Sequence, residues 1–295
     1  MDTLAACFLC SVVPLIFVVC DVCLFKICDY VDMQAPMTIK QYVSQLQTIP
    51  GGRFTMGRTY EIEDVEGFFK DEVPAHPVEV SAFRLGATPV TVAMWREYVS
   101  ADPSLSMPDP PDWGWIDNHP MVNVSWNDIM GVDGMGGYCR WAWKVSGVRL
   151  RLPSEAMFEY AAKGGRDDKY PWGNTFDRSK LWCLKAVGDA GKTTAAVDRT
   201  DHIYRNAFGL TDISGNVVQW CFDFYGPYSS QKRDHLGHPI VVANPEGAAT
   251  GRFRCVRGGS WDYIDPHYFR CANRLRYDPD VRDGLDGFRL SAGLV

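Results

Sequence analysis

Hydrophobic and polar positions alternate over short blocks of this chain, and the block lengths predict short strands. Residues 49–57 carry a Gly-Gly turn followed by alternating side chains, and residues 78–85 alternate as a half-buried strand does. Residues 217–224 show the same two-residue period after a tight Ser-Gly-Asn turn. Strands are therefore expected in the early, middle and late parts of the chain.

Three segments with a helical period lie between these strands. Thr91 is placed to cap a helix that follows it, and a second helix is expected to begin near Asn127. Ser154 and Gly164 are placed at the two ends of a third helix. The proline-rich residues 102–121 predict irregular structure. Few helices, short strands and long loops together predict an α+β fold.

The first residues form the most apolar part of the chain. Residues 4–25 are apolar except for Ser11 and Asp21, which suits the core of a signal peptide or a single anchor helix. Two short stretches resemble the bacterial lipoprotein motif, in which a small residue precedes a cysteine that becomes acylated. We expect lipidation at Cys20, with Cys7 as the alternative.

These patterns divide the chain into three expected parts. Residues 1–28 are expected to be a signal, lipoprotein or membrane-anchor segment, and residues 29–48 a spacer or a short amphipathic helix. Residues 49–295 are expected to form the folded domain. A lipid anchor would place this domain at the cell surface, on a bacterial outer membrane.

Charge and cysteine usage restrict the function. The net charge of −6 and the pI near 5.5 argue against nucleic-acid binding, which needs a basic surface. The five cysteines after residue 28 are an odd set, so they cannot form a complete internal disulfide framework. Most lie beside aromatic residues, where a buried thiol acts as a small apolar group. These five are Cys139, Cys183, Cys221, Cys255 and Cys271.

Several sequence segments, in a fixed order between residues 49 and 293, point to a known family. They are GGRFTMG, DEVPAHPVEVSAF with PVT, HPMVNVSW, RLPSEAMFEYAAKGG, YPWG, AFGLTDISGNVVQW, RGGSW and RDGLDGFRL. In this order they resemble the formylglycine-generating-enzyme or sulfatase-modifying-factor superfamily. The resemblance implies a C-type lectin fold with few helices, short strands and long ordered loops.

The catalytic cysteines of that family are missing from this sequence. The enzymes of the family use two cysteines shortly after the Gly-Gly-Ser turn to bind copper and activate oxygen. Residues 261–268 contain no cysteine, and Cys271 matches a non-catalytic cysteine of the family. We therefore expect a protein that is not an enzyme, with an oxidase that uses an unusual site as the alternative.

The resemblance also implies a calcium site in the GNVVQW loop. Its ligands would be the Asp212 side chain, the carbonyls of Gly215 and Val217, and the side chain at position 219. Gln219 stands where the family has Glu, and the loss of one carboxylate weakens a site for a hard cation. The prediction is no cofactor, with a weak calcium site and a calcium-dependent lectin as the alternative.

The irregular residues between RGGSW and GFRL resemble the variable region of proteins that diversity-generating retroelements diversify. Randomised template adenines turn AAC codons into NNC codons, which never encode Lys, Glu, Gln, Met or Trp. Residues 262–286 contain none of these types, although 10 Lys, 9 Glu, 6 Gln, 10 Met and 10 Trp make up about 15% of the chain. This absence supports a variable region over residues 257–290.

We therefore predict a non-catalytic, surface-displayed protein that binds a ligand with these loop residues. The partner is expected to be a protein or another cell-surface ligand. The membrane contact is expected to come from the lipid anchor, and the chain is expected to be a monomer. The predicted binding residues are Asp262, Tyr263, Ile264, Asp265, His267, Tyr268, Leu275, Arg276, Tyr277, Asp278, Val281, Asp283, Gly284, Leu285 and Asp286.

Overall fold

The computed structural model describes residues 36–63, 67–184, 193–199, 205–228, 235–237 and 240–294. The chain divides into two compact units, Met1–Met37 and Thr38–Val295, and the structure below is that of the second unit. The expected signal or anchor segment and both lipidation candidates, Cys20 and Cys7, lie outside the described residues. Within the described residues, no helix has the length and apolar character that a membrane span needs.

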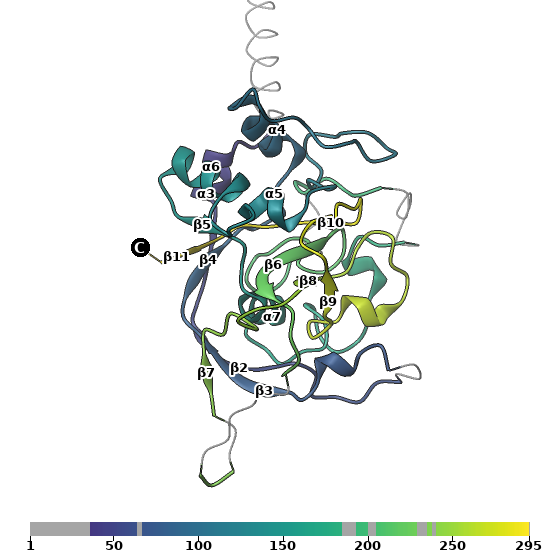
Figure 1. Cartoon of the computed structure of the whole chain (residues 1–295). Helices are drawn as coiled ribbons and strands as arrows, with labels where there is room; N and C mark the ends of the chain where they lie inside the picture. Colours follow the sequence, from purple (N-terminus) through teal and green to yellow (C-terminus); the bar gives the residue numbers. More distant parts are fainter. Residues whose placement is uncertain are drawn as a thin grey trace, which may run out of the picture. The chain divides into compact units, whose positions relative to one another are not determined.

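The first sheet joins the two ends of this unit. Its strand order is β1-β4-β11-β5, and every pairing is antiparallel. Figure 1 shows β11 beside β4 close to the C-terminus, so the last strand is covered on both sides by earlier ones. The four strands are β1 (Gln47–Ile49), β4 (Phe83–Leu85), β5 (Leu150–Arg151) and β11 (Ser291–Gly293).

The second sheet carries the predicted variable region. Its order is β10-β6-β8-β9, with β10 parallel to β6 and the other pairs antiparallel. Because β9 and β10 both come from the variable stretch, the sheet fixes where its loops begin and end. The strands are β6 (Val218–Phe224), β8 (Arg254–Arg257), β9 (Leu275–Tyr277) and β10 (Asp286–Gly287).

A third sheet lies at the lower edge of the domain in Figure 1. It has the order β2-β3-β7, in which β2 and β3 form an antiparallel pair and β7 runs parallel to β3. Its strands are β2 (Gly52–Met56), β3 (His76–Val80) and β7 (Val242–Ala243).

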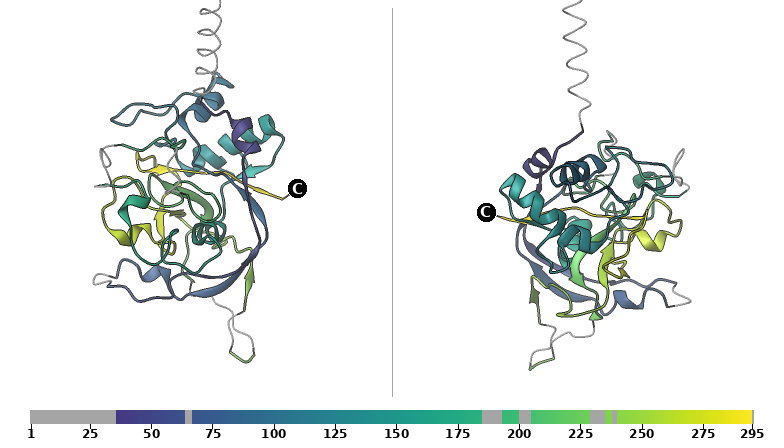
Figure 2. Two further views of the ribbon diagram at one scale, coloured as in Figure 1. Left: turned by 180° about the vertical axis from the view of Figure 1, so that it is seen from behind. Right: turned by 45° about the horizontal axis from the view of Figure 1, so that its top comes forward.

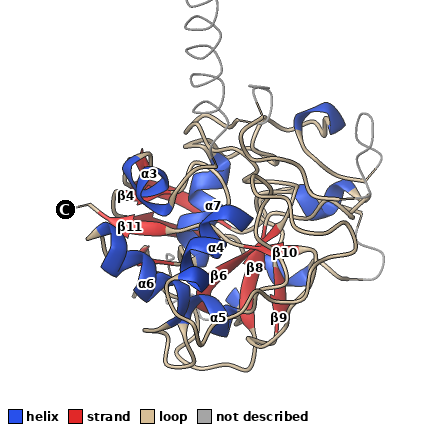
Figure 3. Cartoon of the chain, turned by 90° about the horizontal axis from the view of Figure 1, so that it is seen from above, coloured by secondary structure: helices blue, strands red, loops and turns tan. Residues whose placement is uncertain are grey.

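The helices begin and end where the sequence places caps. Thr91, Ser125 and Ser154 each accept a hydrogen bond from the backbone of the first turn, and Gly164 ends its helix with φ 62°. In Figure 3 the labelled helices lie towards the left of the view, around β4 and β11, and long loops fill the right. The α-helices are α3 (Ile39–Ser44), α4 (Val92–Ser100), α5 (Trp126–Met130), α6 (Gly137–Ser146) and α7 (Glu155–Lys163), and the 3-10 helices used below are η1 (Lys70–Glu72), η2 (Arg178–Lys180) and η5 (Pro266–Phe269).

Helix α7 lies at the centre of the core. It packs against β2, β3, β6 and β8, and its apolar residues belong to the main hydrophobic cluster. It also carries Glu155, Glu159 and Lys163, which are buried and spaced four residues apart along one face. Figure 2 shows the yellow C-terminal segment crossing the domain before it reaches the edge at the C-terminus.

The α+β prediction is confirmed, but two expected boundaries need correction. The compact unit begins at Thr38 and not at Ile49, because α3 packs against α6 with Ile39 and Tyr42 buried. The alternating residues 78–85 do not form one strand. They contribute to β3 and β4, which belong to different sheets. Alternation indicates which face of a strand is buried, and it does not identify the partner strand.

Candidate functional site: a loop face on a buried polar frame

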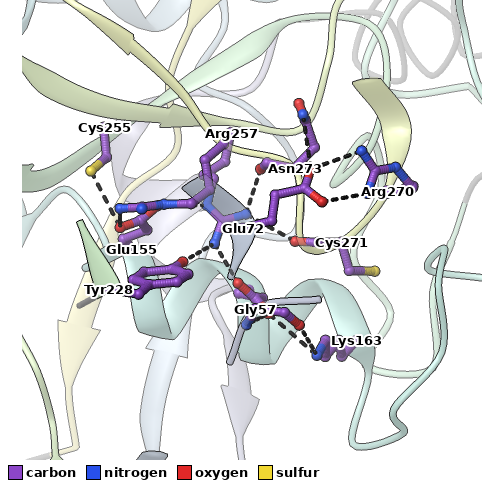
Figure 4. A network of polar contacts seen from close by, with 12 residues as sticks. Gly57, Glu72, Glu155, Lys163, Tyr228, Cys255, Arg257, Arg270, Cys271 and Asn273 are labelled. Carbon is purple, nitrogen blue, oxygen red and sulfur yellow. Dashed lines mark hydrogen bonds and ion pairs between the residues drawn. The ribbon is translucent and has the colours of Figure 1, made fainter. Parts of the chain in front are cut away.

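The C-terminal stretch is anchored by arginines that are themselves buried. Arg270 follows η5 and donates to Glu72 Oε1 at 2.8 Å, with both side chains fully buried. Asn273 donates to the same oxygen at 3.3 Å, and Arg58 Nε lies 3.1 Å from Glu72 Oε2. Figure 4 shows Glu72 held between Arg270 and Asn273. These contacts fix the segment after η5 to the segment that contains η1.

Two further arginines converge on helix α7. Arg274 donates to both carboxylate oxygens of Glu155, at 2.7 and 2.8 Å. Arg257 Nε lies 3.1 Å from Glu155, and the same guanidinium donates to Glu159 and to the Cys271 carbonyl. Figure 4 shows Arg257 between these carboxylates and the chain around Cys271. Removal of one member of such a network leaves a buried charge unpaired, which is strongly destabilising.

The two central carboxylates respond differently to burial. Burial acts to raise the pKa of Glu155, but the guanidinium groups of Arg274 and Arg257 outweigh it and lower the pKa to about 2. The pKa of Glu72 is raised, because its burial outweighs the attraction of Arg270. Glu155 is therefore the stronger electrostatic anchor of the C-terminal stretch.

The GFRL segment, residues 287–290, forms a second anchor at the other end. Arg289 is fully buried and donates to Gln219 Oε1 at 2.5 Å and to the Gly86 carbonyl at 2.9 Å. Phe288 packs edge-on against Trp95 and Tyr138, with ring centroids 6.0 and 5.4 Å apart. We use the name polar frame for Glu72, Glu155, Arg257, Arg270, Asn273, Arg274 and Arg289.

The residues between these anchors form a face of ordered loops. Fourteen of the fifteen predicted binding residues reach the surface. The four exposed ones are Asp262, Ile264, Arg276 and Asp283. The ten partly exposed ones are Tyr263, Asp265, His267, Tyr268, Leu275, Tyr277, Asp278, Val281, Gly284 and Leu285. We call these fourteen residues the loop face.

Aromatic contacts give the loop face its internal order. The Tyr263 ring lies 4.9 Å from the Tyr268 ring, and the Tyr263 and Tyr277 hydroxyls are 3.4 Å apart. Asp265 caps η5 by accepting from the His267 backbone N–H at 2.8 Å. The face therefore presents aromatic side chains from a rigid support, which lowers the entropy that a ligand has to remove.

Asp286 is the exception, and its assignment to the binding face needs correction. Its side chain is 0% exposed, because β10 pairs with the central strand β6 through Asp286 and Val218. Neither carboxylate oxygen has a hydrogen-bond partner within the described part of the chain. Burial, and then the charge of Asp283, raise the pKa of Asp286 well above its usual range. Asp286 is thus a core residue whose environment favours the protonated carboxyl.

Residues from distant parts of the sequence border the loop face. The Phe69 ring lies 5.4 Å from His267, Arg178 donates to the Ile264 carbonyl at 3.3 Å, and the Asn123 N–H donates to the Asp283 carbonyl at 2.9 Å. Phe68 is 69% exposed next to Phe69. Sequence reasoning missed these neighbours, since no local pattern marks a residue that becomes adjacent only through the fold.

The oxygens predicted to hold calcium are engaged inside the protein. The Asp212 carboxylate pairs with Arg199 and accepts from Asn216 at 2.8 Å. Gln219 accepts from Arg289 and donates to the Asp212 carbonyl at 2.7 Å. The carbonyls of Gly215 and Val217 accept from the Val217 N–H and the Gln219 amide. A calcium ion would have to displace these contacts. The weak calcium site therefore remains a prediction that a calcium-binding measurement has to test.

The five cysteines of the described residues offer no activated thiol. Cys139, Cys183, Cys221, Cys255 and Cys271 are free and buried. Burial raises the pKa of Cys271 to about 12 and that of Cys255 well above the usual range, whereas copper binding needs thiolates. Within the described residues, no group of three or more His, Cys, Asp or Glu side chains could hold a metal ion.

The sheets, helices and loops define an α+β protein with the C-type lectin fold of the formylglycine-generating-enzyme type. The profile of the sulfatase-modifying factor enzyme 1-like domain matches residues 33–293, and the chain belongs to this family. It is 31% identical over 300 residues to a formylglycine-generating enzyme of Streptomyces coelicolor, which covers 82% of this chain and 87% of the relative.

Two solved structures extend the comparison. Treponema denticola variable protein 1 superposes with a TM-score of 0.62 at 25% identity, over 84% of this chain and 95% of its own. PvdO from Pseudomonas aeruginosa superposes with a TM-score of 0.65 at 25% identity, over 84% of this chain and 93% of its own. The resemblance to the family and to a variable protein, which the sequence predicted, is confirmed.

Proposed function

We propose that this chain is a non-catalytic, surface-displayed protein that binds its ligand with the loop face, and that a retroelement diversifies this face. The observation that carries the proposal is the separation of roles within one stretch of sequence. The frame residues Arg257, Arg270 and Arg274 are buried in ion pairs, whereas the fourteen loop-face residues of the same stretch reach the surface. Likeness to a protein described as variable supports the same function.

The energetics of the loop face suit a site that changes its sequence. Substitution of exposed residues away from buried networks usually changes stability by no more than about 0.5 kcal/mol. Asp262, Ile264, Arg276 and Asp283 meet this condition, since their side chains are exposed. A large set of sequences could therefore share the fold and differ in the ligand that they bind.

The chemistry of the loop face favours a protein or another cell-surface ligand. Tyr263, Tyr268 and Tyr277 supply aromatic contact area, and Asp and Arg side chains surround them. The mixture of rigid aromatic anchors and charged groups is typical of surfaces that recognise proteins. The binding unit is proposed to be a monomer.

Display of a codon library on phage tests the proposal. One library carries NNC codons at Asp262, Ile264, Arg276 and Asp283. A matched library carries them at four exposed positions outside the loop face: Lys40, Arg53, Arg140 and Lys144. Both are selected against hen egg-white lysozyme as a defined protein target. The proposal predicts folded lysozyme binders from the first library only. Equal success of both libraries, or loss of folding throughout the first, would contradict it.

Attachment to an outer membrane through acylated Cys20, with Cys7 as the alternative, is part of the proposal. It is supported by the apolar residues 4–25 that surround these cysteines. Growth with an alkyne-tagged palmitate, followed by fluorophore coupling, should label the wild-type chain and Cys7→Ser. The label should be lost in Cys20→Ser, and the reverse pattern would move the anchor to Cys7.

An oxidase is the second candidate, because the chain is 31% identical to a formylglycine-generating enzyme. Within the described residues it would have to use buried thiols, and residues 261–268, which follow the Gly-Gly-Ser turn, contain no cysteine. Titration of the full chain with Cu(I) and a cysteine-containing peptide under oxygen decides the point. Turnover of the peptide thiol would establish the oxidase, and neither copper binding nor turnover is expected.

A further inference from the structure

A cavity of about 400 Å³ lies between β7 and the start of α7. Most of its wall is apolar, formed by side chains such as Met56, Phe224, Pro227 and Val242. Ile240 and Val242 at this cavity are 44% and 40% exposed. Figure 1 shows β7 at the lower left of the domain and β10 at the upper right, so β7 stands away from the end of the variable stretch. The volume lies within the range of small-molecule sites.

The charged groups of the wall leave one carboxylate without a counter-ion. Glu155 and Arg274 face the cavity, but they neutralise each other through the two-pronged ion pair of the polar frame. His76 contacts the Pro74 carbonyl through Nδ1 at 3.1 Å and packs edge-on against Tyr228. Among the described residues of the wall, the remaining carboxylate is that of Asp223.

Asp223 is held in place without an ion pair. It is 2% exposed and accepts from the Glu155 backbone N–H at 2.7 Å. No Arg, Lys or His of the described residues lies within 4.0 Å of its carboxylate. The nearby Arg151 is paired with Glu246 at 2.8 Å, and Arg254, whose charge also acts on Asp223, stacks on the rings of Trp126 and Phe224. Burial, followed by the charge of Glu155, raises the pKa of Asp223 to about 8. A cationic group in the cavity would relieve both effects.

The backbone around Asp223 is packed closely enough to fix this geometry. A Cβ on Gly247 would lie 2.7 Å from Asp223 Cβ and 2.8 Å from the Phe224 carbonyl oxygen, so this position requires glycine. A Cβ on Gly226 would lie 2.9 Å from Ala248 Cβ. A larger residue at Gly247 or Gly226 would therefore force the backbone around Asp223 to move.

We infer that this cavity binds a small organic cation, with a primary ammonium against Asp223 and an apolar body against Phe224, Met56 and Val242. A primary ammonium supplies three hydrogen-bond donors and the missing positive charge. The site is distinct from the loop face, and it stands whether or not the loop face binds a protein.

The test compares two probes of similar size and opposite charge on the full chain. 2-Phenylethylammonium and 3-phenylpropionate are titrated at pH 7 and followed by isothermal calorimetry. The inference predicts a Kd for the ammonium at least tenfold lower than for the carboxylate. Because Asp223 is mostly protonated when the cavity is empty at this pH, binding should also release about one proton.

Three variants locate the binding. Asp223→Asn keeps an acceptor for the Glu155 N–H and removes the charge, and it should raise the Kd at least tenfold. Val242→Trp covers the cavity from an exposed position and should have the same effect. Asp262→Asn removes a charge from the loop face and should leave the Kd unchanged. Equal affinity for both probes, no binding of either, or full affinity in Asp223→Asn would overturn the inference.

Discussion

The arginines of the polar frame and the residues of the loop face alternate along the same stretch of about thirty residues, yet they differ in burial and in their partners. Arg257, Arg270 and Arg274 each bind buried carboxylates, whereas Asp262, Ile264 and Arg276 end at the surface. The polar frame fixes the path of the backbone, and the loop face supplies the side chains that a ligand can contact. The comparison teaches that a segment without regular secondary structure can be rigid, when polar anchors are spaced along it.

The largest effect is expected from loss of one frame arginine. Arg274→Met keeps the length of the side chain and leaves Glu155 with Arg257 as its remaining partner, so the free energy of unfolding should fall by about 3–5 kcal/mol. Urea unfolding followed by circular dichroism measures it. Arg282→Met is the matched control, since Arg282 pairs with Asp128 at 2.7 Å near the surface. The control should cost less than about 1 kcal/mol, and equal losses would remove the distinction between frame and face.

Asp286 should behave as a member of the core although it lies in the variable stretch. Its pKa is raised in the folded state, so stability is fully present below the unfolded pKa and declines as pH rises towards the folded pKa. Asp286→Asn removes this decline. Its gain over the wild type should grow as the pH rises above the unfolded pKa, by at most about 1.4 kcal/mol per pH unit.

Urea unfolding at three pH values in this range measures the gain. Asp262→Asn, at an exposed position of the loop face, is the control and should show no such trend. If the stability gain of Asp286→Asn over the wild type does not depend on pH, Asp286 is solvated. It would then count as a loop-face residue, as the sequence predicted.

Substitutions on the loop face should be nearly silent for folding. The fourfold variant Asp262→Ser, Ile264→Ser, Arg276→Ser and Asp283→Ser changes exposed side chains without touching the frame. Each change is expected to alter stability by no more than about 0.5 kcal/mol. Differential scanning calorimetry gives the melting temperature. Unfolding of this variant at room temperature would show that the face also carries the fold.

The smallest effect is expected from calcium. Asp212 pairs with Arg199, and Gln219 with Arg289, so a cation would have to displace two guanidinium groups. Bound calcium at a hundred times its Kd would add about 2.7 kcal/mol to stability. We expect the melting temperature to be the same in calcium chloride and in a chelator. A rise of several degrees with calcium would restore the lectin alternative.

The sequence predicted the fold class and the helices well, because their signals are local. Ser154 and Gly164 delimit α7 as expected, and the ordered segments identified the family. Prediction from the sequence failed where the position of a residue depends on which strands pair in the folded protein. Residues 78–85 divide between two sheets, and Asp286 becomes buried because β10 joins β6. No local period distinguishes Asp286 from Asp283, since a strand of two residues carries no pattern.

The same limit applies to the candidate site. The frame residues Arg270 and Arg274 could be separated from the variable positions by their fit to the family. Their partners Glu72 and Glu155 lie 198 and 119 residues away in sequence, and no spacing rule finds them. Phe69 and Arg178 reach the loop face in the same way.

The most direct test of a diversified binding face is the nucleotide sequence around the gene. The account predicts a near-copy of the segment that encodes residues 257–290, beside a reverse-transcriptase gene. The copy should differ from the gene only at adenines, in codons for loop-face residues and Asp286, and codons for Arg257, Arg270 and Arg274 should match. A locus without such a copy, or a copy that differs in the frame codons as often as in the face codons, would contradict the central claim.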